Sequence, residues 1–112
     1  MSECIFCKIA NQEIPVPLLY DRDGVVAFSD LNPQAPVHVL VIPKVHHENA
    51  AQSAAANPAV IGALFAAAAS LALEHGLDGY RTTFNTGESA GQSVFHTHMH
   101  LLGGRPFAWP PG

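Results

Sequence analysis

Three histidines at alternate positions constrain the fold of this chain more than any other feature: His96, His98 and His100. Successive side chains of a β-strand point to opposite faces, so this spacing places all three imidazoles on one face of a strand. The residues that alternate with them, from Thr97 to Leu101, are mostly apolar and can pack on a core. We therefore predict a strand over residues 94–102 whose histidine face lines a cleft.

The composition limits the partners of the chain. Its 112 residues carry a formal net charge of −4, and only five of them are Lys or Arg. Nucleic acids and anionic membranes require clustered cations, so neither is expected as a partner. A bound phosphate must be held mainly by backbone amides, polar side chains and histidine. The length suits one domain over residues 1–112.

The N-terminal residues and the longest apolar stretch both predict a cytoplasmic protein. No charged segment followed by an apolar run stands at the N-terminus, so no secretory signal is expected. The apolar stretch over residues 59–73 is shorter than the roughly 20 residues that span a bilayer.

The N-terminal half predicts a short helix and three strands. Pro15 and Pro17 would end the helix, and Asp21 to Gly24 is a turn-prone stretch whose Asp-Gly pair is typical of hairpins. The expected elements are a helix over residues 5–12, paired antiparallel strands over 18–20 and 25–28, and a central strand over 37–42. His38 shares a face of that central strand with Leu40, so by itself it is either a histidine at the edge of a core or a functional group.

The C-terminal half predicts one long helix and two strands. Asn57 and Pro58 are typical of a helix N-cap and first position, and Gly76 of a C-terminal stop. The remaining elements are a strand over residues 80–85, a loop over 87–93, the histidine strand and a proline-rich tail over 106–112. The helix carries an apolar stripe that can cover one face of a sheet: Val60, Ile61, Leu64, Phe65, Ala68, Leu71 and Ala72.

The loop before the histidines favours phosphoryl chemistry. Loop amides can bind non-bridging oxygens, and a neutral imidazole at His98 can attack phosphorus, which splits one displacement into two. Gln92, Ser93 and Asn85 are placed to contact the phosphate or the leaving group. The competing interpretation is an open zinc site, because alternate histidines on a strand can converge on one ion.

A Cys-x-x-Cys pair at Cys4 and Cys7 raises a separate possibility. Two histidines from elsewhere would complete a closed zinc site, and the candidates are His46 or His47 together with His96. Two ordinary thiols are the alternative. A redox role is disfavoured, because no strand precedes the pair as in a thioredoxin-like unit.

These motifs in order resemble the histidine triad superfamily. The segment 96–102 matches its signature of alternating histidine and apolar residues, with Thr97 as the one departure. The resemblance extends through residues 5–9, 28–38, 41–44, 91–95 and 102–105. The ending Trp-Pro-Pro-Gly is most similar to the Hint branch, the histidine triad nucleotide-binding proteins.

The resemblance implies a fold and an activity. The implied fold is α+β, with a five-stranded antiparallel sheet, one long helix and a short N-terminal helix. The implied assembly is a homodimer with a continuous ten-stranded sheet. The implied activity is hydrolysis of purine nucleoside phosphoramidates to the nucleoside 5′-monophosphate, with no cofactor required for catalysis.

The resemblance assigns catalytic roles to five residues. His98 is the nucleophile that becomes nucleotidylated, and His96 and His100 flank the phosphate. His38 is the supporting histidine that orients His98, and Ser93 contacts the phosphate or leaving group.

The resemblance also implies a nucleotide site. Asp30 accepts the ribose hydroxyls, and Trp109 lies in a tail that reaches the partner subunit's active site. Apolar residues wall the base: Phe6, Ile9, Phe28, Leu31 and Leu40. The remaining nucleotide contacts are Asn32, Asn85, Gly91, Gln92 and Ser93, together with His98 and His100.

Some relatives bind zinc through the residues that correspond here to Cys4, Cys7, His46 and His96. In that case His96 is structural, and zinc contributes stability rather than chemistry. Two other functions remain open, a nucleotide-binding regulatory module and a dinucleoside polyphosphate hydrolase, the second disfavoured by the tail and by Gln92-Ser93.

Overall fold

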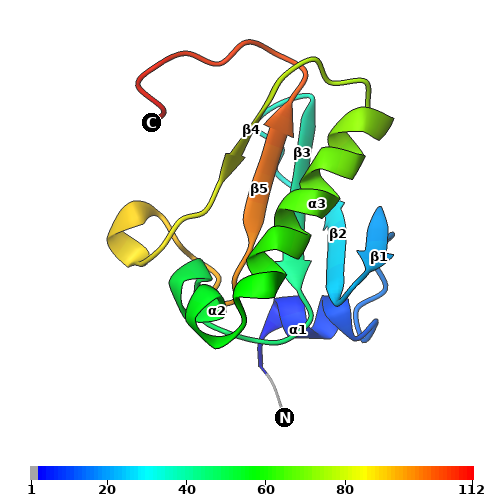
Figure 1. Cartoon of the computed structure of the whole chain (residues 1–112), viewed down its shortest axis with the longest axis vertical. Helices are drawn as coiled ribbons and strands as arrows, with labels where there is room; N and C mark the ends of the chain where they lie inside the picture. Colours follow the sequence, from blue (N-terminus) through cyan, green and yellow to red (C-terminus); the bar gives the residue numbers. More distant parts are fainter. Residues whose placement is uncertain (1–2) are drawn as a thin grey trace.

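The computed structural model describes residues 3–112, which form a five-stranded antiparallel sheet with helices on both faces (Figure 1). The strand order is β1-β2-β3-β5-β4. The strands are β1 Tyr20–Arg22, β2 Val25–Ser29, β3 Val37–Pro43, β4 Tyr80–Thr83 and β5 Met99–Gly103. The helices are α1 Ile5–Ala10, α2 Ala50–Ala56, α3 Pro58–Glu74 and the short 3₁₀ helix η1 Glu88–Ala90. The predicted α+β class and five-stranded sheet are confirmed.

The hairpin between β1 and β2 turns over two residues. Asp23 and Gly24 have φ values of 57° and 77°, and Arg22 pairs directly with Val25. Positive φ at both central positions is the geometry that favours Asp-Gly in tight hairpins. The first strand was predicted over residues 18–20, but β1 covers Tyr20–Arg22, because only Asp23 and Gly24 make the turn.

The predicted histidine strand is wrong in its extent. β5 begins at Met99, so His100 is the member of the triad that lies in the strand, while His96 and His98 lie in the irregular segment before it. The opposite face behaves as predicted, since Thr97 and Met99 are fully buried. The loss of strict alternation lets the imidazoles of His96 and His98 point to different surroundings.

The long helix α3 starts and stops where the sequence predicts. Pro58 occupies its first turn, and Gly76 follows its last residues with a φ of 65°. The predicted apolar stripe is correct at Leu64 and wrong at Phe65, whose side chain is half exposed. The short helix α2 was not predicted, although Asn49 caps it by accepting a hydrogen bond from the Gln52 amide at 2.9 Å.

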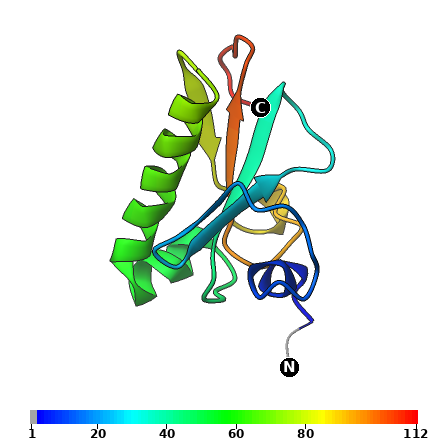
Figure 2. The same ribbon diagram turned by 90° about the vertical axis from the view of Figure 1, so that its right-hand side faces the viewer.

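Two hydrophobic clusters lie on opposite faces of the sheet. The first joins α3 to one face through Leu64, Leu71 and Leu101. The second joins α1 to the other face through Phe6 and Leu40. Figure 2 shows α3 on one side of the sheet and α1 at the lower end of the other. The face beside α1 is less completely covered, and it carries the histidines.

Within residues 3–112, no helix combines the length and the apolar character that crossing a membrane requires.

Truncation of Leu64 tests the packing of α3. Leu64 is 0% exposed and Leu73, in the same helix, is 82% exposed. Leu64→Ala should lower the free energy of unfolding by about 2–5 kcal/mol, because it opens a cavity in the core. Leu73→Ala is the matched control and should change it by less than about 0.5 kcal/mol. Urea unfolding followed by circular dichroism measures both, and equal losses would contradict this packing.

Candidate functional site

The pairing of β3 with β5 puts two histidines on the sheet face opposite α3. Leu40 pairs with His100, and His38 pairs with Leu102, so these four side chains share one face. A cavity of about 410 Å³ opens on this face next to α1. Its lining is mainly apolar and comes from α1, from the segment before β1, and from β2. Its polar lining residues are Ser29, Asp30, Ser93, His98 and His100.

His98 is held with a defined ring nitrogen available for chemistry. Its Nδ1 lies 2.8 Å from the carbonyl oxygen of His96, which can only accept, so Nδ1 carries the proton. Nε2 of the neutral ring therefore keeps its lone pair. The His98 ring packs edge-on against the ring of Phe6, with 5.1 Å between the ring centres, and its centre also lies 5.1 Å from that of the His100 ring. A buried neutral imidazole with a free lone pair at a cavity is a suitable nucleophile.

His38 and His100 form a hydrogen-bonded pair. The backbone N–H of Gln34 donates to Nδ1 of His38 at 3.0 Å, so that nitrogen is unprotonated and Nε2 of the neutral ring carries the proton. Nε2 of His38 lies 2.9 Å from Nδ1 of His100 and donates to it. The proton of neutral His100 is consequently on its own Nε2, which makes His100 a hydrogen-bond donor. His38 thus contacts His100, whereas the predicted partner was His98.

Burial keeps this pair neutral. Desolvation lowers the pKa of His38, and the nearby carboxylate of Asp30 partly opposes this shift. Desolvation, followed by the positive charges that His98 and His38 would carry, lowers the pKa of His100 to about 4. Asp30 Oδ2 lies 3.5 Å from Nε2 of His38, and Asp30 Oδ1 accepts the Asn32 amide at 2.8 Å.

A second cluster lies behind His98 and consists of Cys4, Cys7, His46 and His96. One ligand atom of each residue lies within 4.8 Å of the others. Nδ1 of His96 is 3.4 Å from Sγ of Cys4, 3.5 Å from Sγ of Cys7 and 3.1 Å from Nδ1 of His46. The structure therefore brings together the four residues implied by the resemblance, with His46 rather than His47 in the cluster.

The donor set of this cluster fits zinc. Tetrahedral Zn²⁺ with ordinary bond lengths separates sulfur from nitrogen by about 3.6 Å and nitrogen from nitrogen by about 3.3 Å, close to the distances found. Nε2 of His96 lies 2.8 Å from the Pro43 carbonyl and donates to it, so Nδ1 has the lone pair that a metal needs. Burial lowers the pKa of His96, which also favours the neutral ring.

The other predicted nucleotide contacts fall into two groups. The residues predicted to wall the base all line the cavity, although Leu31 is 100% exposed and lies at its rim: Phe6, Ile9, Phe28, Leu31 and Leu40. Five other predicted contacts are not among the lining residues: Asn32, Asn85, Gly91, Gln92 and Trp109.

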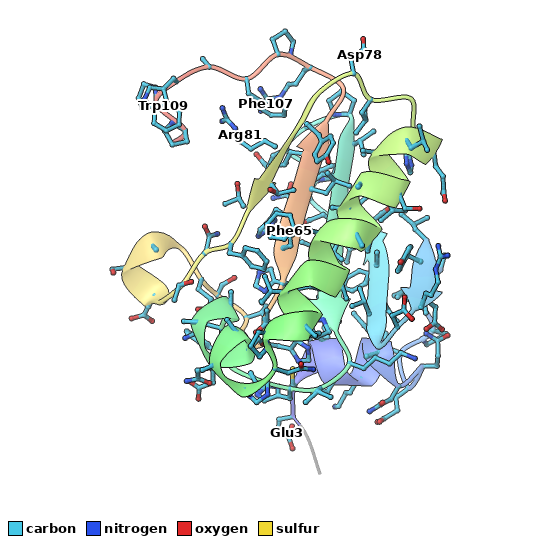
Figure 3. The ribbon with its side chains drawn as sticks, in the orientation of Figure 1. Glu3, Phe65, Asp78, Arg81, Phe107 and Trp109 are labelled. Carbon is cyan, nitrogen blue, oxygen red and sulfur yellow. The ribbon has the colours of Figure 1, made fainter. Side chains whose placement is uncertain are left out.

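The positions of three of these residues explain why. The side-chain Nε2 of Gln92 donates to the carbonyls of Glu48 and Val94, and its Oε1 accepts a hydrogen bond from the backbone N–H of Gly87. The buried side chain of Gln92 therefore holds the loop in place. Asn85 lines a smaller hollow of about 270 Å³ on the other side of His100. Trp109 is 82% exposed in the tail, far from α1 (Figure 3).

Sequence reasoning missed part of the lining. Val16, Pro17 and Leu19 line the cavity from the segment between α1 and β1, and Ile5 and Val94 complete it. Val16 and Pro17 lie in a proline-rich connection that carries no periodic signal, and Leu19 falls in the strand predicted over residues 18–20, so nothing in the sequence marks these residues as cavity lining.

Comparison with known proteins supports the motif-based interpretation. A model of the HIT domain, the histidine triad domain, matches residues 11–107. The chain belongs to the HIT family. An uncharacterized HIT-like protein of Synechococcus elongatus is 50% identical over the full length of both chains.

Two further relatives of this HIT protein have informative names. A 14 kDa zinc-binding protein of Zea mays is 46% identical over 99% of this chain and 89% of its own length. The crystal structure of a HIT family hydrolase from Legionella pneumophila is 42% identical, with a TM-score of 0.93 over 98% of this chain and all of that one.

Acid should destabilise the HIT domain through His100. In the folded protein its pKa is about 4, against an ordinary value of 6.5, so between these values the unfolded chain binds more protons. The free energy of unfolding should therefore fall as the pH falls from about 6.5 towards 4. His100→Asn should make this fall shallower without abolishing it, since the pKa of His38 is also lowered.

The control for this experiment is His75→Asn, at an exposed histidine that ends α3. Urea unfolding at a series of pH values gives the slope for each variant. The same slope for both variants would refute the contribution of His100.

Proposed function

We propose that this protein hydrolyses purine nucleoside phosphoramidates through a covalent intermediate on His98. The observation that carries the proposal is the bond from Nδ1 of His98 to the His96 carbonyl, which leaves the Nε2 lone pair for attack at the edge of the cavity. The name of the Legionella pneumophila relative, a HIT family hydrolase, supports a hydrolytic reaction.

The cavity suits the nucleoside half of such a substrate. Its volume of about 410 Å³ is in the range of about 300–1,000 Å³ typical of small-molecule sites. Phe6 and Phe28 pack edge-to-face at 5.6 Å and offer an apolar wall to a purine base. Asp30 lies at the same cavity, where its carboxylate can accept hydrogen bonds from both ribose hydroxyls.

The proposed reaction has two displacements at phosphorus. Nε2 of His98 forms a bond to phosphorus, and the bond from phosphorus to the leaving nitrogen breaks. The nitrogen keeps that electron pair and takes up one proton from solvent. Nε2–H of neutral His100 donates to a non-bridging oxygen and stabilises its growing charge. In the second displacement the oxygen of a water molecule forms a bond to phosphorus and the bond from phosphorus to Nε2 of His98 breaks. Nε2 keeps that electron pair, the water gives up one proton to solvent, and the nucleoside monophosphate leaves.

We propose further that two copies join along β4. This strand is the last in the sheet order and pairs with β5 along one edge. Half-exposed aromatic side chains lie close to that edge. Tyr80 is in β4, and the ring centre of Phe65 lies 6.2 Å from that of Phe84, the residue that follows β4. Pairing of two such edges would produce the implied ten-stranded sheet, and Trp109 would then be available to the partner's site.

Zinc at the Cys4, Cys7, His46 and His96 cluster is the remaining part of the proposal. The zinc-binding name of the Zea mays relative supports it, as does the fit of the distances. Bound zinc would supply a rigid link between α1, the segment after β3 and the segment before β5. Catalysis is assigned to His98 and His100 alone.

Replacement of His98 tests the nucleophile. His98→Ala should reduce the release of AMP from adenosine 5′-phosphoramidate by at least about 10³-fold, because the covalent route is lost. His75→Ala is the matched control at an exposed histidine and should keep the wild-type rate. Rapid quench into base followed by mass spectrometry should detect a nucleotidyl group on the wild type and none on His98→Ala.

Other outcomes would favour the alternative functions. AMP binding without any hydrolysis would indicate a nucleotide-binding regulatory module. Turnover of dinucleoside polyphosphates in preference to phosphoramidates would indicate the dinucleotide hydrolase. Undiminished turnover by His98→Ala would exclude the proposed mechanism.

A matched pair of histidine variants tests the zinc site. His46→Asn should lower the zinc content from one ion per chain to a small fraction, since four ligands are needed for a closed site. His47→Asn alters the neighbouring histidine outside the cluster and should retain the ion. Chelation should lower the unfolding temperature of the wild type and of His47→Asn but leave that of His46→Asn unchanged. Equal zinc content in the two variants would refute this ligand set.

A further inference from the structure

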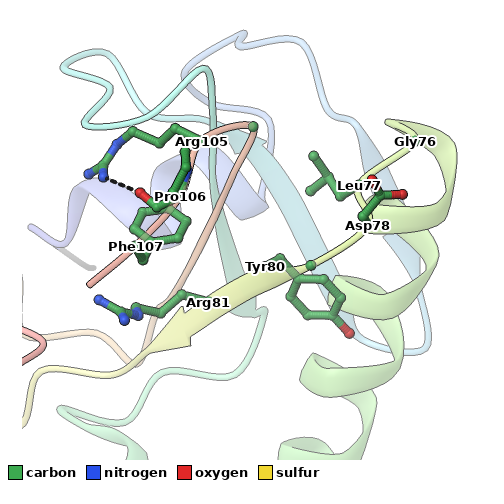
Figure 4. A pocket seen from close by; sticks show the side chains of 10 residues that line it. Gly76, Leu77, Asp78, Tyr80, Arg81, Arg105, Pro106 and Phe107 are labelled. Carbon is green, nitrogen blue, oxygen red and sulfur yellow. Dashed lines mark hydrogen bonds between the residues drawn. The ribbon is translucent and has the colours of Figure 1, made fainter. Parts of the chain in front are cut away.

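Arg105 directs its guanidinium to backbone carbonyls. Its Nε and Nη2 donate to the Gln34 carbonyl at 3.2 and 3.1 Å, and its Nη1 donates to the Pro106 carbonyl at 3.0 Å. The guanidinium carbon lies 4.3 Å from the centre of the Phe107 ring. Figure 4 shows the ring between the side chains of Arg105 and Arg81, the second of which lies 5.0 Å from it. These contacts hold an exposed arginine in one geometry.

The turn after β5 meets the same loop a second time. Gly104 has a φ of 91°, and a Cβ placed on it would lie only 2.9 Å from Cβ of Pro36. The backbone of Gly104 therefore lies directly against Pro36. The loop between β2 and β3 is thus held at two positions, Gln34 by Arg105 and Pro36 by Gly104.

Gln34 is also the residue that determines the tautomer of His38. Its amide donates to Nδ1 of His38, and an amide N–H can only donate. His38 in turn donates from Nε2 to Nδ1 of His100. One continuous series of contacts therefore joins the guanidinium of Arg105 to the catalytic face, through Gln34 and His38 to His100.

We propose that Arg105 is a positioning residue for the reaction: it fixes Gln34 so that the Gln34 amide holds His38 and His100 with their protons on Nε2. The proposal rests on the proposed function, in which Nε2–H of His100 contacts the phosphate. Two charge-assisted bonds to a single carbonyl fix that residue more firmly than a neutral contact does. The planar fork of arginine is required for this, and the ammonium of lysine does not supply it.

The alternative positioning group for His38 is Asp30. Its Oδ2 is 3.5 Å from Nε2 of His38, longer than the 2.9 Å separation from His100. A carboxylate near Nε2 would favour the same tautomer but leaves Nδ1 without a donor. The Gln34 amide acts at that second nitrogen, so its loss should let the proton of His38 move between the two nitrogens.

Two matched pairs of variants test the proposal. Arg105→Gln removes the two-pronged contact, with Arg22→Gln as the control at an exposed arginine of β1. Gln34→Pro removes the amide hydrogen, with Gln34→Ala as the control that keeps it. Because Gln34→Pro can also distort the loop, Arg105→Gln keeps the test valid if that variant does not fold.

The measurement is the nitrogen-15 spectrum of the histidine rings in the substrate-free protein. We expect one tautomer, with Nε2 protonated, at His38 and His100 in the wild type and in both controls. Mixed tautomers are expected in Arg105→Gln and in Gln34→Pro. Wild-type ring spectra in Arg105→Gln, or protonated Nδ1 at His38 in the wild type, would overturn the proposal.

Kinetics with adenosine 5′-phosphoramidate add a second readout. Arg105→Gln should lower kcat by about 10-fold with little change in KM, as for other groups that orient a catalytic residue through a hydrogen bond. An equal fall in Arg22→Gln would contradict a specific role. If the wild type hydrolyses no phosphoramidate while the ring spectra behave as expected, the proposed function fails, and what stands is the control of the His38 and His100 tautomers by Arg105.

Discussion

The register between β3 and β5 is the constraint on which the rest of the site depends. Leu40 opposite His100 and His38 opposite Leu102 place both histidines on the face beside α1, while Val39 and Leu101 pack beneath α3. A shift of either strand by one residue would send its histidine into the core and its apolar side chains into the cavity. The burial of the α3 face therefore fixes the geometry of the reactive face, because one register must satisfy both.

Backbone groups control where the protons of the histidines lie. The His96 carbonyl sets the tautomer of His98, the Pro43 carbonyl that of His96, and the Gln34 amide that of His38. Backbone groups thus set these three tautomers, and at His38 the carboxylate of Asp30, 3.5 Å from Nε2, favours the same one. Such fixed dipoles need little reorganisation when charge develops in a reaction.

The sequence predicted the central strand and the long helix, because these depend on local patterns, and the resemblance implied the four residues of the cysteine cluster. The predicted partner of His38 was wrong, because His38 contacts His100 rather than His98. Sequence reasoning failed where long-range contacts decide. Alternate spacing predicted one column of imidazoles, yet the irregular backbone before Met99 turns His96 towards Cys7 and leaves His98 at the cavity. The hydrogen bond of the Gln92 side chain with the Glu48 carbonyl joins two segments whose proximity no local pattern encodes. The Thr97 departure from the motif also has a physical reason, a hydroxyl contact of 2.6 Å with buried Ser53.

His96 contributes to two sites with different atoms. Its ring belongs to the cysteine cluster, whereas its carbonyl oxygen holds the ring of His98. Every amino acid has that carbonyl, so the reactive site places no demand on the identity of the side chain at this position. The cluster and the reactive centre can therefore diverge independently in evolution: a descendant that replaced both cysteines and filled the space of the His96 ring with another side chain could keep the same nucleophile.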